Sequence, residues 1–137
     1  MPTTPHLLRF PATLSGLAEA ARALCTLLDD GGRTGPGRYN VELAFEEIAV
    51  NIVNHGAATG EITAAVVLDQ AETVLTFEDD GVPFDPRDQP DPRLPTSIHE
   101  ATVGGLGIML VRNLSSRMSY ERTAEGRNRL TIAIPVQ

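Results

Sequence analysis

The chain has 137 residues, of which 42% are hydrophobic, and this composition is typical of one folded domain spanning residues 1–137. Eighteen acidic residues against eleven basic ones give a formal net charge of -7, which argues against direct nucleic-acid binding, because such binding requires a basic surface. No apolar run approaches the length of a membrane span and the N-terminus lacks a signal-peptide pattern, so we expect a cytoplasmic protein without membrane contact.

The first half of the chain predicts a strand, two helices and a hairpin. Residues 6–10 can form a short strand, and residues 12–32 predict a helix with apolar positions at Leu14, Leu17, Ala21, Leu24 and Leu28. A second helix is expected from about Tyr39 to Asn54, with an apolar stripe at Val41, Ala44 or Phe45, Ile48 and Ile52. Two apolar segments around a short turn at residues 70–71 then predict a β-hairpin.

The second half begins with a loop rich in aspartate and proline, from residue 85 to about residue 103. A third helix is expected to begin within the glycine cluster near residue 104, and residues 118–124 and 127–136 predict a closing hairpin. The order β-α-α-β-β-α-β-β predicts an α+β protein. We expect a two-layer sandwich with the helices on one face of a mixed, mostly antiparallel sheet.

Three polar side chains share one face of the second helix. Glu47, Asn51 and His55 follow one another at intervals of four residues, away from the apolar stripe. Such a triplet is compatible with an ordinary solvated face as well as with a functional site. The spacing alone does not decide between these interpretations.

A carboxylate and a glycine end the strand that contains "TFEDDG". A fixed carboxylate at Asp80 can accept a hydrogen bond from an exocyclic amine, and Gly81 leaves room for a flat ring to approach the backbone. Aspartate followed by glycine is also a common turn sequence, so the pair alone is a weak indication.

The third helix begins in the segment "VGGLGIML". Gly104, Gly105 and Gly107 can expose backbone N–H groups at the positive end of the helix dipole, which favours phosphate binding. A dinucleotide-binding fingerprint is the competing interpretation. It is disfavoured because the cluster follows a long loop late in the chain and places Leu110 where that motif has glycine or alanine.

The three segments together resemble the ATP-binding domain of the GHKL superfamily, which includes gyrase-type ATPases, histidine kinases and anti-sigma factor kinases. The segment "EEIAVNIVNHG" resembles its N box, "DDGVPFDP" its G1 box and "GGLGIML" its G2 box. The match is most similar to the small anti-sigma factor serine/threonine kinases of bacteria. The resemblance covers residues 42–110 and implies a Bergerat-type ATP-binding fold.

The resemblance also implies a role for each motif residue. It implies that Asp80 binds the adenine amino group, that Asn51 helps to hold Mg²⁺ on the phosphates of ATP, and that Glu47 acts as the catalytic base. The remaining nucleotide-binding positions implied are His55, Gly81, Gly104, Gly105, Leu106 and Gly107. The loop of residues 85–103 corresponds to the ATP lid.

Two positions depart from the superfamily pattern. Pro83 replaces the second glycine of the G1 box, in a form familiar from the anti-sigma branch. Near the C-terminus, Arg127 and Asn128 follow Gly126 where the superfamily often has a threonine close to the phosphates. The resemblance therefore leaves open whether the last hairpin contacts the phosphates of ATP.

The function that this resemblance implies is phosphoryl transfer from Mg²⁺-ATP to a serine or threonine of a small anti-sigma antagonist protein. The expected partners are that antagonist and a sigma factor that the kinase sequesters, and a homodimer is left open. One alternative is a regulatory module that binds ATP and a partner protein without phosphoryl transfer. Another, the detached ATP domain of a histidine kinase, is disfavoured because no helix resembles its dimerising, phosphorylatable element.

Overall fold

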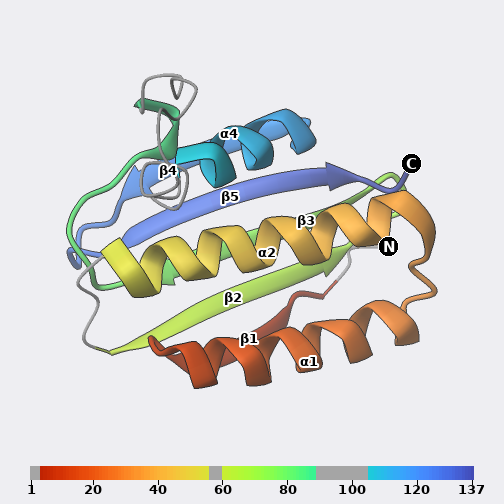
Figure 1. Cartoon of the computed structure of the whole chain (residues 1–137), viewed down its shortest axis with the longest axis horizontal. Helices are drawn as coiled ribbons and strands as arrows, with labels where there is room; N and C mark the ends of the chain where they lie inside the picture. Colours follow the sequence, from red (N-terminus) through yellow and green to blue (C-terminus); the bar gives the residue numbers. More distant parts are fainter. Residues whose placement is uncertain (1–3, 56–59, 89–104) are drawn as a thin grey trace, which may run out of the picture.

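The computed structural model describes residues 4–55, 60–88 and 105–137 (Figure 1). Its elements in chain order are β1 (His6–Pro11), α1 (Leu14–Asp30), α2 (Gly35–His55), β2 (Glu61–Leu68), β3 (Glu72–Asp79), the short 3-10 helix η1 (Pro86–Asp88), α4 (Gly105–Leu114), β4 (Arg117–Arg122) and β5 (Asn128–Pro135). None of the helices in these ranges is long and apolar enough to cross a membrane.

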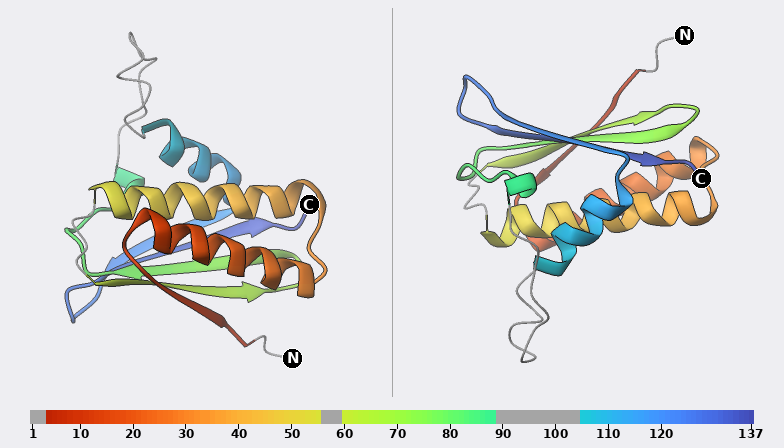
Figure 2. Two further views of the ribbon diagram at one scale, coloured as in Figure 1. Left: turned by 60° about the horizontal axis from the view of Figure 1, so that its bottom comes forward. Right: turned by 90° about the horizontal axis from the view of Figure 1, so that it is seen from above.

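The five strands form one sheet in the order β1-β2-β3-β5-β4. All four neighbouring pairs in this sheet are antiparallel, so the described strands lack the parallel pair that a mixed sheet implies. Helices α1, α2 and α4 lie together on one face of the sheet (Figure 2). This arrangement confirms the expected α+β two-layer sandwich.

Helix α1 begins one residue after Thr13, whose side-chain oxygen accepts a hydrogen bond from the backbone N–H of Gly16 at 3.0 Å. This is a normal N-cap, and it satisfies a donor that the first helical turn would leave unpaired. The expected apolar face is shifted at two positions. Leu14 is 62% exposed, and Ala20 rather than Ala21 is buried beside Leu17.

Helix α2 begins at Gly35, four residues before the predicted start at Tyr39. The sequence "GPGR" suggested a turn, but Pro36 is compatible with a first helical turn, where its missing N–H costs no hydrogen bond. Gly37 brings this turn against the end of β5. A Cβ atom at Gly37 would overlap the carbonyl oxygen of Val136, so only glycine permits this approach.

The core lies between the sheet and the helices, and Phe45 of α2 stands at its centre. The Phe45 ring centroid is 6.0 Å from that of Phe10 and 5.5 Å from that of Phe77. In β3, the inward face carries Thr73, Leu75, Phe77 and Asp79, because successive side chains of a strand point to opposite faces. The same apolar row that fills the core therefore ends in a carboxylate.

Candidate functional site

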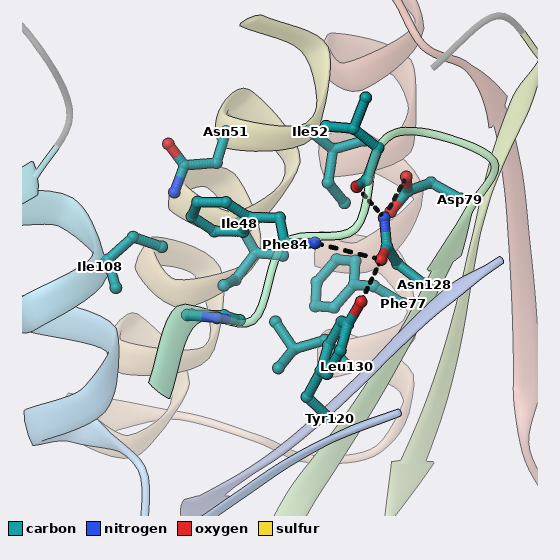
Figure 3. A pocket seen from close by; sticks show the side chains of 12 residues that line it. Ile48, Asn51, Ile52, Phe77, Asp79, Phe84, Ile108, Tyr120, Asn128 and Leu130 are labelled. Carbon is teal, nitrogen blue, oxygen red and sulfur yellow. Dashed lines mark hydrogen bonds between the residues drawn. The ribbon is translucent and has the colours of Figure 1, made fainter. Parts of the chain in front are cut away.

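A pocket opens where the ends of β3, β4 and β5 meet the inner faces of α2 and α4 (Figure 3). It encloses a cavity of about 40 Å³, and about 490 Å³ when the open solvent at its mouth is included. Its walls are mainly apolar and contain four polar side chains. The lining residues are Ile48, Asn51, Ile52, Phe77, Asp79, Val82, Phe84, Pro86, Ile108, Tyr120, Asn128 and Leu130.

Asp79 provides the buried carboxylate of this pocket and is only 4% exposed. Its Oδ1 accepts hydrogen bonds from the backbone N–H of Gly81 at 2.8 Å and from Nδ2 of Asn128 at 3.1 Å. Both bonds use the same oxygen. The Asp79 carboxylate is therefore held in one orientation, and Oδ2 remains as the acceptor for a donor that enters the pocket.

Asp80, the aspartate predicted from the sequence, is exposed and does not line the pocket. Its Oδ1 accepts a long hydrogen bond of 3.4 Å from the backbone N–H of Gly60. The structure thus brings Asp79 into the pocket in place of Asp80. The sequence contained the signal, because Asp79 has the strand parity of the buried residues Leu75 and Phe77.

Gly81 contributes through its backbone, as its N–H binds Asp79 and its carbonyl oxygen accepts a hydrogen bond from Nη1 of Arg122 at 2.8 Å. Arg122 also donates to Oδ1 of Asn128 at 3.1 Å. Asn128 pairs with both Asp79 and Arg122 in the sheet register, so the ends of three adjacent strands meet at this point. Asn128 lines the pocket but was not predicted as a site residue from the sequence.

The helical wall is formed by α2 and α4. Asn51 reaches the pocket from α2, on the side that faces Ile108 of α4 (Figure 3). Glu47 lies one turn earlier on α2, half-buried, with its carboxylate packed against Gly107. A Cβ atom on Gly107 would overlap Oε2 of Glu47, so the missing side chain lets α4 approach this carboxylate.

The other predicted site residues lie partly outside the described residues. Helix α2 ends at His55, but the structure does not describe its side chain. Gly104 lies outside the described ranges, and Gly105 and Leu106 are described only as the beginning of α4. Of the predicted G2-box residues, Gly107 alone has described surroundings.

Comparison of the sequence with known proteins identifies the family of the chain. The sequence model of the histidine kinase-like ATPase domain matches residues 10–134 of the chain. The chain belongs to this family. It is 34% identical over 98 residues to the serine/threonine-protein kinase BtrW of Bordetella bronchiseptica, a match that covers 69% of this chain and 68% of that protein.

Two solved structures share the fold of this histidine kinase-like ATPase domain. One is the SiaB–SiaC complex of Pseudomonas aeruginosa, with a TM-score of 0.59, 18% identity, and coverage of 95% of this chain and 89% of that chain. The other is the histidine kinase AdeS of Acinetobacter baumannii, with a TM-score of 0.51, 14% identity, and coverage of 100% and 70%. At these identities the likeness concerns the fold alone.

The predicted lid begins at Asp85, directly after the pocket residue Phe84. A hydrogen-bonded turn forms at this point. The Asp85 carboxylate accepts from Nε of Arg87 at 3.0 Å, from its Nη2 at 2.7 Å and from its backbone N–H at 2.9 Å. The side-chain hydrogen bond from Arg87 is the main cause that lowers the pKa of Asp85 below its ordinary value. Residues 89–103 of the predicted lid lie outside the described residues.

The oxygen-bearing side chains around the pocket are compatible with a metal ion that is held mainly by phosphates and water. No group of three or more histidine, cysteine, aspartate and glutamate side chains is assembled for a metal within residues 4–55, 60–88 and 105–137. Mg²⁺ needs no such cage, because it commonly binds one or two protein oxygens together with substrate phosphates and waters. Within the described residues the Asn51 amide makes no hydrogen bond, so its oxygen fits this role.

Proposed function

We propose that this chain is a protein serine/threonine kinase in which one domain, residues 1–137, binds Mg²⁺-ATP and phosphorylates a small partner protein. The observation that carries the proposal is one apolar pocket lined by both the buried acceptor Asp79 and Asn51 of α2. Glu47 lies one turn before Asn51 on the same helix, against Gly107 of α4. The relationship to a serine/threonine kinase supports transfer to a hydroxyl group.

Adenine recognition is assigned to Asp79 and not to Asp80. The purine would lie between apolar walls that include Ile52 and Phe77, and Oδ2 of Asp79 would accept a hydrogen bond from its exocyclic amine. Burial excludes water from this bond, which strengthens it. A purine with a carbonyl oxygen at the same position would place an acceptor against the carboxylate and would bind less well.

The triphosphate would extend from the adenine toward the beginning of α4. The backbone N–H groups of the first turn and the positive end of the helix dipole stabilise phosphate charge there. When bound, Mg²⁺ supplies positive charge to the phosphates. Asn51 would contribute an oxygen to its coordination.

Glu47 is assigned as the base. The serine or threonine hydroxyl oxygen of the partner bonds to the γ-phosphorus, the bond to the β,γ-bridging oxygen breaks, and ADP leaves with that oxygen. The Glu47 carboxylate accepts the hydroxyl proton. Its position against Gly107 is adjacent to the helix start that would hold the phosphates, which supports this role.

The proposed partners are a small anti-sigma antagonist, as phosphorylation substrate, and a sigma factor that the kinase sequesters. The test uses labelled ATP, the purified chain and small antagonist proteins encoded near its gene. Acid-stable label on a serine or threonine of an antagonist supports the kinase. Acid-labile label on histidine would indicate a histidine kinase domain. ATP binding without label transfer would indicate a regulatory binding module.

Removal of the Asn51 side chain should weaken ATP binding mainly through the metal. We expect Asn51→Ala to lower ATP affinity by roughly tenfold with Mg²⁺ present, the scale of one hydrogen bond or ligand contact to a charged group, and to change it little in EDTA. Isothermal titration under both conditions measures the difference. Equal losses in both conditions would instead indicate a distorted pocket.

A methyl group at Gly107 should displace Glu47 without harming the fold. In Gly107→Ala the added carbon would overlap the end of a flexible carboxylate, so the carboxylate moves and α4 stays. We expect phosphorylation to fall roughly 10- to 100-fold, because small misplacements of reacting groups have effects of this size. Alanine should leave the free energy of unfolding unchanged or raise it by about 0.5–1 kcal/mol, because glycine is unfavourable within a helix.

The double variant Glu47→Gln/Gly107→Ala provides the control. If Gly107 acts through Glu47, the second substitution adds little to the first, because both remove the same interaction. Full additivity, or a loss of ATP affinity as large as the loss of turnover, would assign Gly107 to nucleotide binding instead.

A further inference from the structure

The Asn128 side chain is 6% exposed and uses all of its hydrogen-bonding groups. Its Nδ2 donates to Oδ1 of Asp79 at 3.1 Å and to the carbonyl oxygen of Val82 at 2.8 Å. Its Oδ1 accepts from the hydroxyl of Tyr120, from Arg122, and from the backbone N–H of Phe84 at 3.4 Å. Figure 3 shows this amide between the Asp79 carboxylate and the Tyr120 hydroxyl.

These contacts permit only one orientation of the amide. If the amide of Asn128 were rotated by 180°, its oxygen would face two acceptors, on Asp79 and Val82. Its NH₂ group would face the guanidinium of Arg122, which can only donate. Mismatched partners of a buried amide are costly, so the amide stays as a fixed donor toward Asp79.

The fixed donor determines which oxygen of Asp79 faces the pocket. Because Asn128 and the N–H of Gly81 both bind Oδ1, the Asp79 carboxylate cannot rotate freely, and Oδ2 keeps one direction. The same amide holds Val82 and Phe84, which form part of the pocket wall. The Asn128 side chain of β5 therefore positions both the Asp79 carboxylate and this part of the pocket wall.

We propose that Asn128 is the positioning residue for nucleobase selectivity, acting through Asp79 to favour a 6-aminopurine over a 6-oxopurine. The proposal rests on the proposed binding of ATP in this pocket but not on phosphoryl transfer. The role needs a donor toward the Asp79 carboxylate, which the asparagine amide supplies and a threonine hydroxyl can also supply.

A matched pair of variants separates this role from a structural one. Asn128→Thr and Asn128→Val have nearly the same shape, and both β-branched side chains are favourable in a strand. Only threonine keeps a hydroxyl that can donate to Asp79. Both variants lose the bond to Val82, and valine also lacks an oxygen that can accept from Tyr120 and Arg122. The comparison is therefore made on the ratio of ITP to ATP affinity, which depends on the acceptor of Asp79, and not on affinity alone.

The measurement is the ratio of the dissociation constants of ITP and ATP, by isothermal titration without any protein substrate. ITP replaces the exocyclic amine of adenine by a carbonyl oxygen. We expect wild type to favour ATP by roughly ten- to a hundredfold, the scale of one hydrogen bond to a charged group. Asn128→Thr should keep most of this preference, and Asn128→Val should reduce it to within roughly threefold of unity.

Each outcome has a definite meaning. Equal ratios for wild type, Asn128→Thr and Asn128→Val would overturn the proposal, even if both variants bind nucleotides more weakly. In an Asp79→Asn background the valine substitution should not change the ratio further, and a further change would overturn action through Asp79. A chain that binds neither nucleotide would overturn the proposed site itself. A chain that shows the predicted ratios but transfers no phosphate would retain this inference and lose the kinase.

Discussion

Replacement of Asp79 by asparagine should weaken ATP and ADP binding by roughly ten- to a hundredfold, the scale of a lost hydrogen bond to a charged acceptor. The new amide cannot satisfy the site in either orientation. With its NH₂ group toward the pocket, it opposes the adenine amine. With its NH₂ group inward, it opposes the N–H of Gly81 and Nδ2 of Asn128. Isothermal titration measures the affinity, and thermal unfolding checks that the variant is folded.

Asp80→Asn is the matched control, because it makes the same chemical change one residue later. Asp80 is exposed and outside the pocket, so we expect ATP affinity within roughly twofold of wild type, as for most surface substitutions. The opposite result, with Asp80→Asn defective and Asp79→Asn normal, would restore the assignment made from the sequence and contradict the one made from the pocket.

Glu47→Gln should produce the largest kinetic effect. The substitution keeps the shape of the side chain and removes the proton acceptor, and general-base assistance contributes roughly 100- to 10,000-fold to a rate. Because a base acts mainly in the transition state, phosphorylation of the proposed antagonist should fall by this range, while ATP affinity and the proposed complex with a sigma factor stay close to wild type. Initial rates with labelled ATP and titrations of the same preparation measure both quantities.

Glu46→Gln provides the control for charge and helix composition. Glu46 is exposed, whereas the neighbouring Glu47 is half-buried against α4, because adjacent helical residues point about 100° apart. Glu46→Gln should therefore phosphorylate at the wild-type rate. If Glu47→Gln does so too, Glu47 is not the base. If wild type transfers no phosphate to any antagonist, the chain is a binding module.

The fold could be predicted from the sequence because its signals are periodic. The alternation in β3 and the leucines of α1 each specify an element and its buried face within a few residues. The start of α2 was missed because "GPGR" is compatible with both a turn and a first helical turn. The contact between Gly37 and Val136 belongs to the helical alternative, and no local pattern contains a contact between residues so distant in sequence.

The sequence indicates the segments of the candidate site and one of its side chains, Asn51, which lines the pocket. The choice between Asp79 and Asp80 depends on strand parity, and the alternation from Leu75 through Phe77 identifies the inward residue. Asn128 could not be found in this way. Its role depends on the register between β3 and β5, which pairs it with Asp79, and on a rotamer that its neighbours impose.

The pairing of Asp79 with Asn128 also sets a time order for the newly made chain. The two residues are 49 positions apart, and α4 and β4 are synthesised between them. Helix α2 and the β2–β3 hairpin can form while translation continues, but β3 gains its second neighbour only after β5 has left the ribosome. Until then the Asp79 carboxylate lacks the hydrogen bond from the Asn128 amide and is exposed to water. A nascent chain should thus acquire nucleotide affinity late and abruptly, with the last strand.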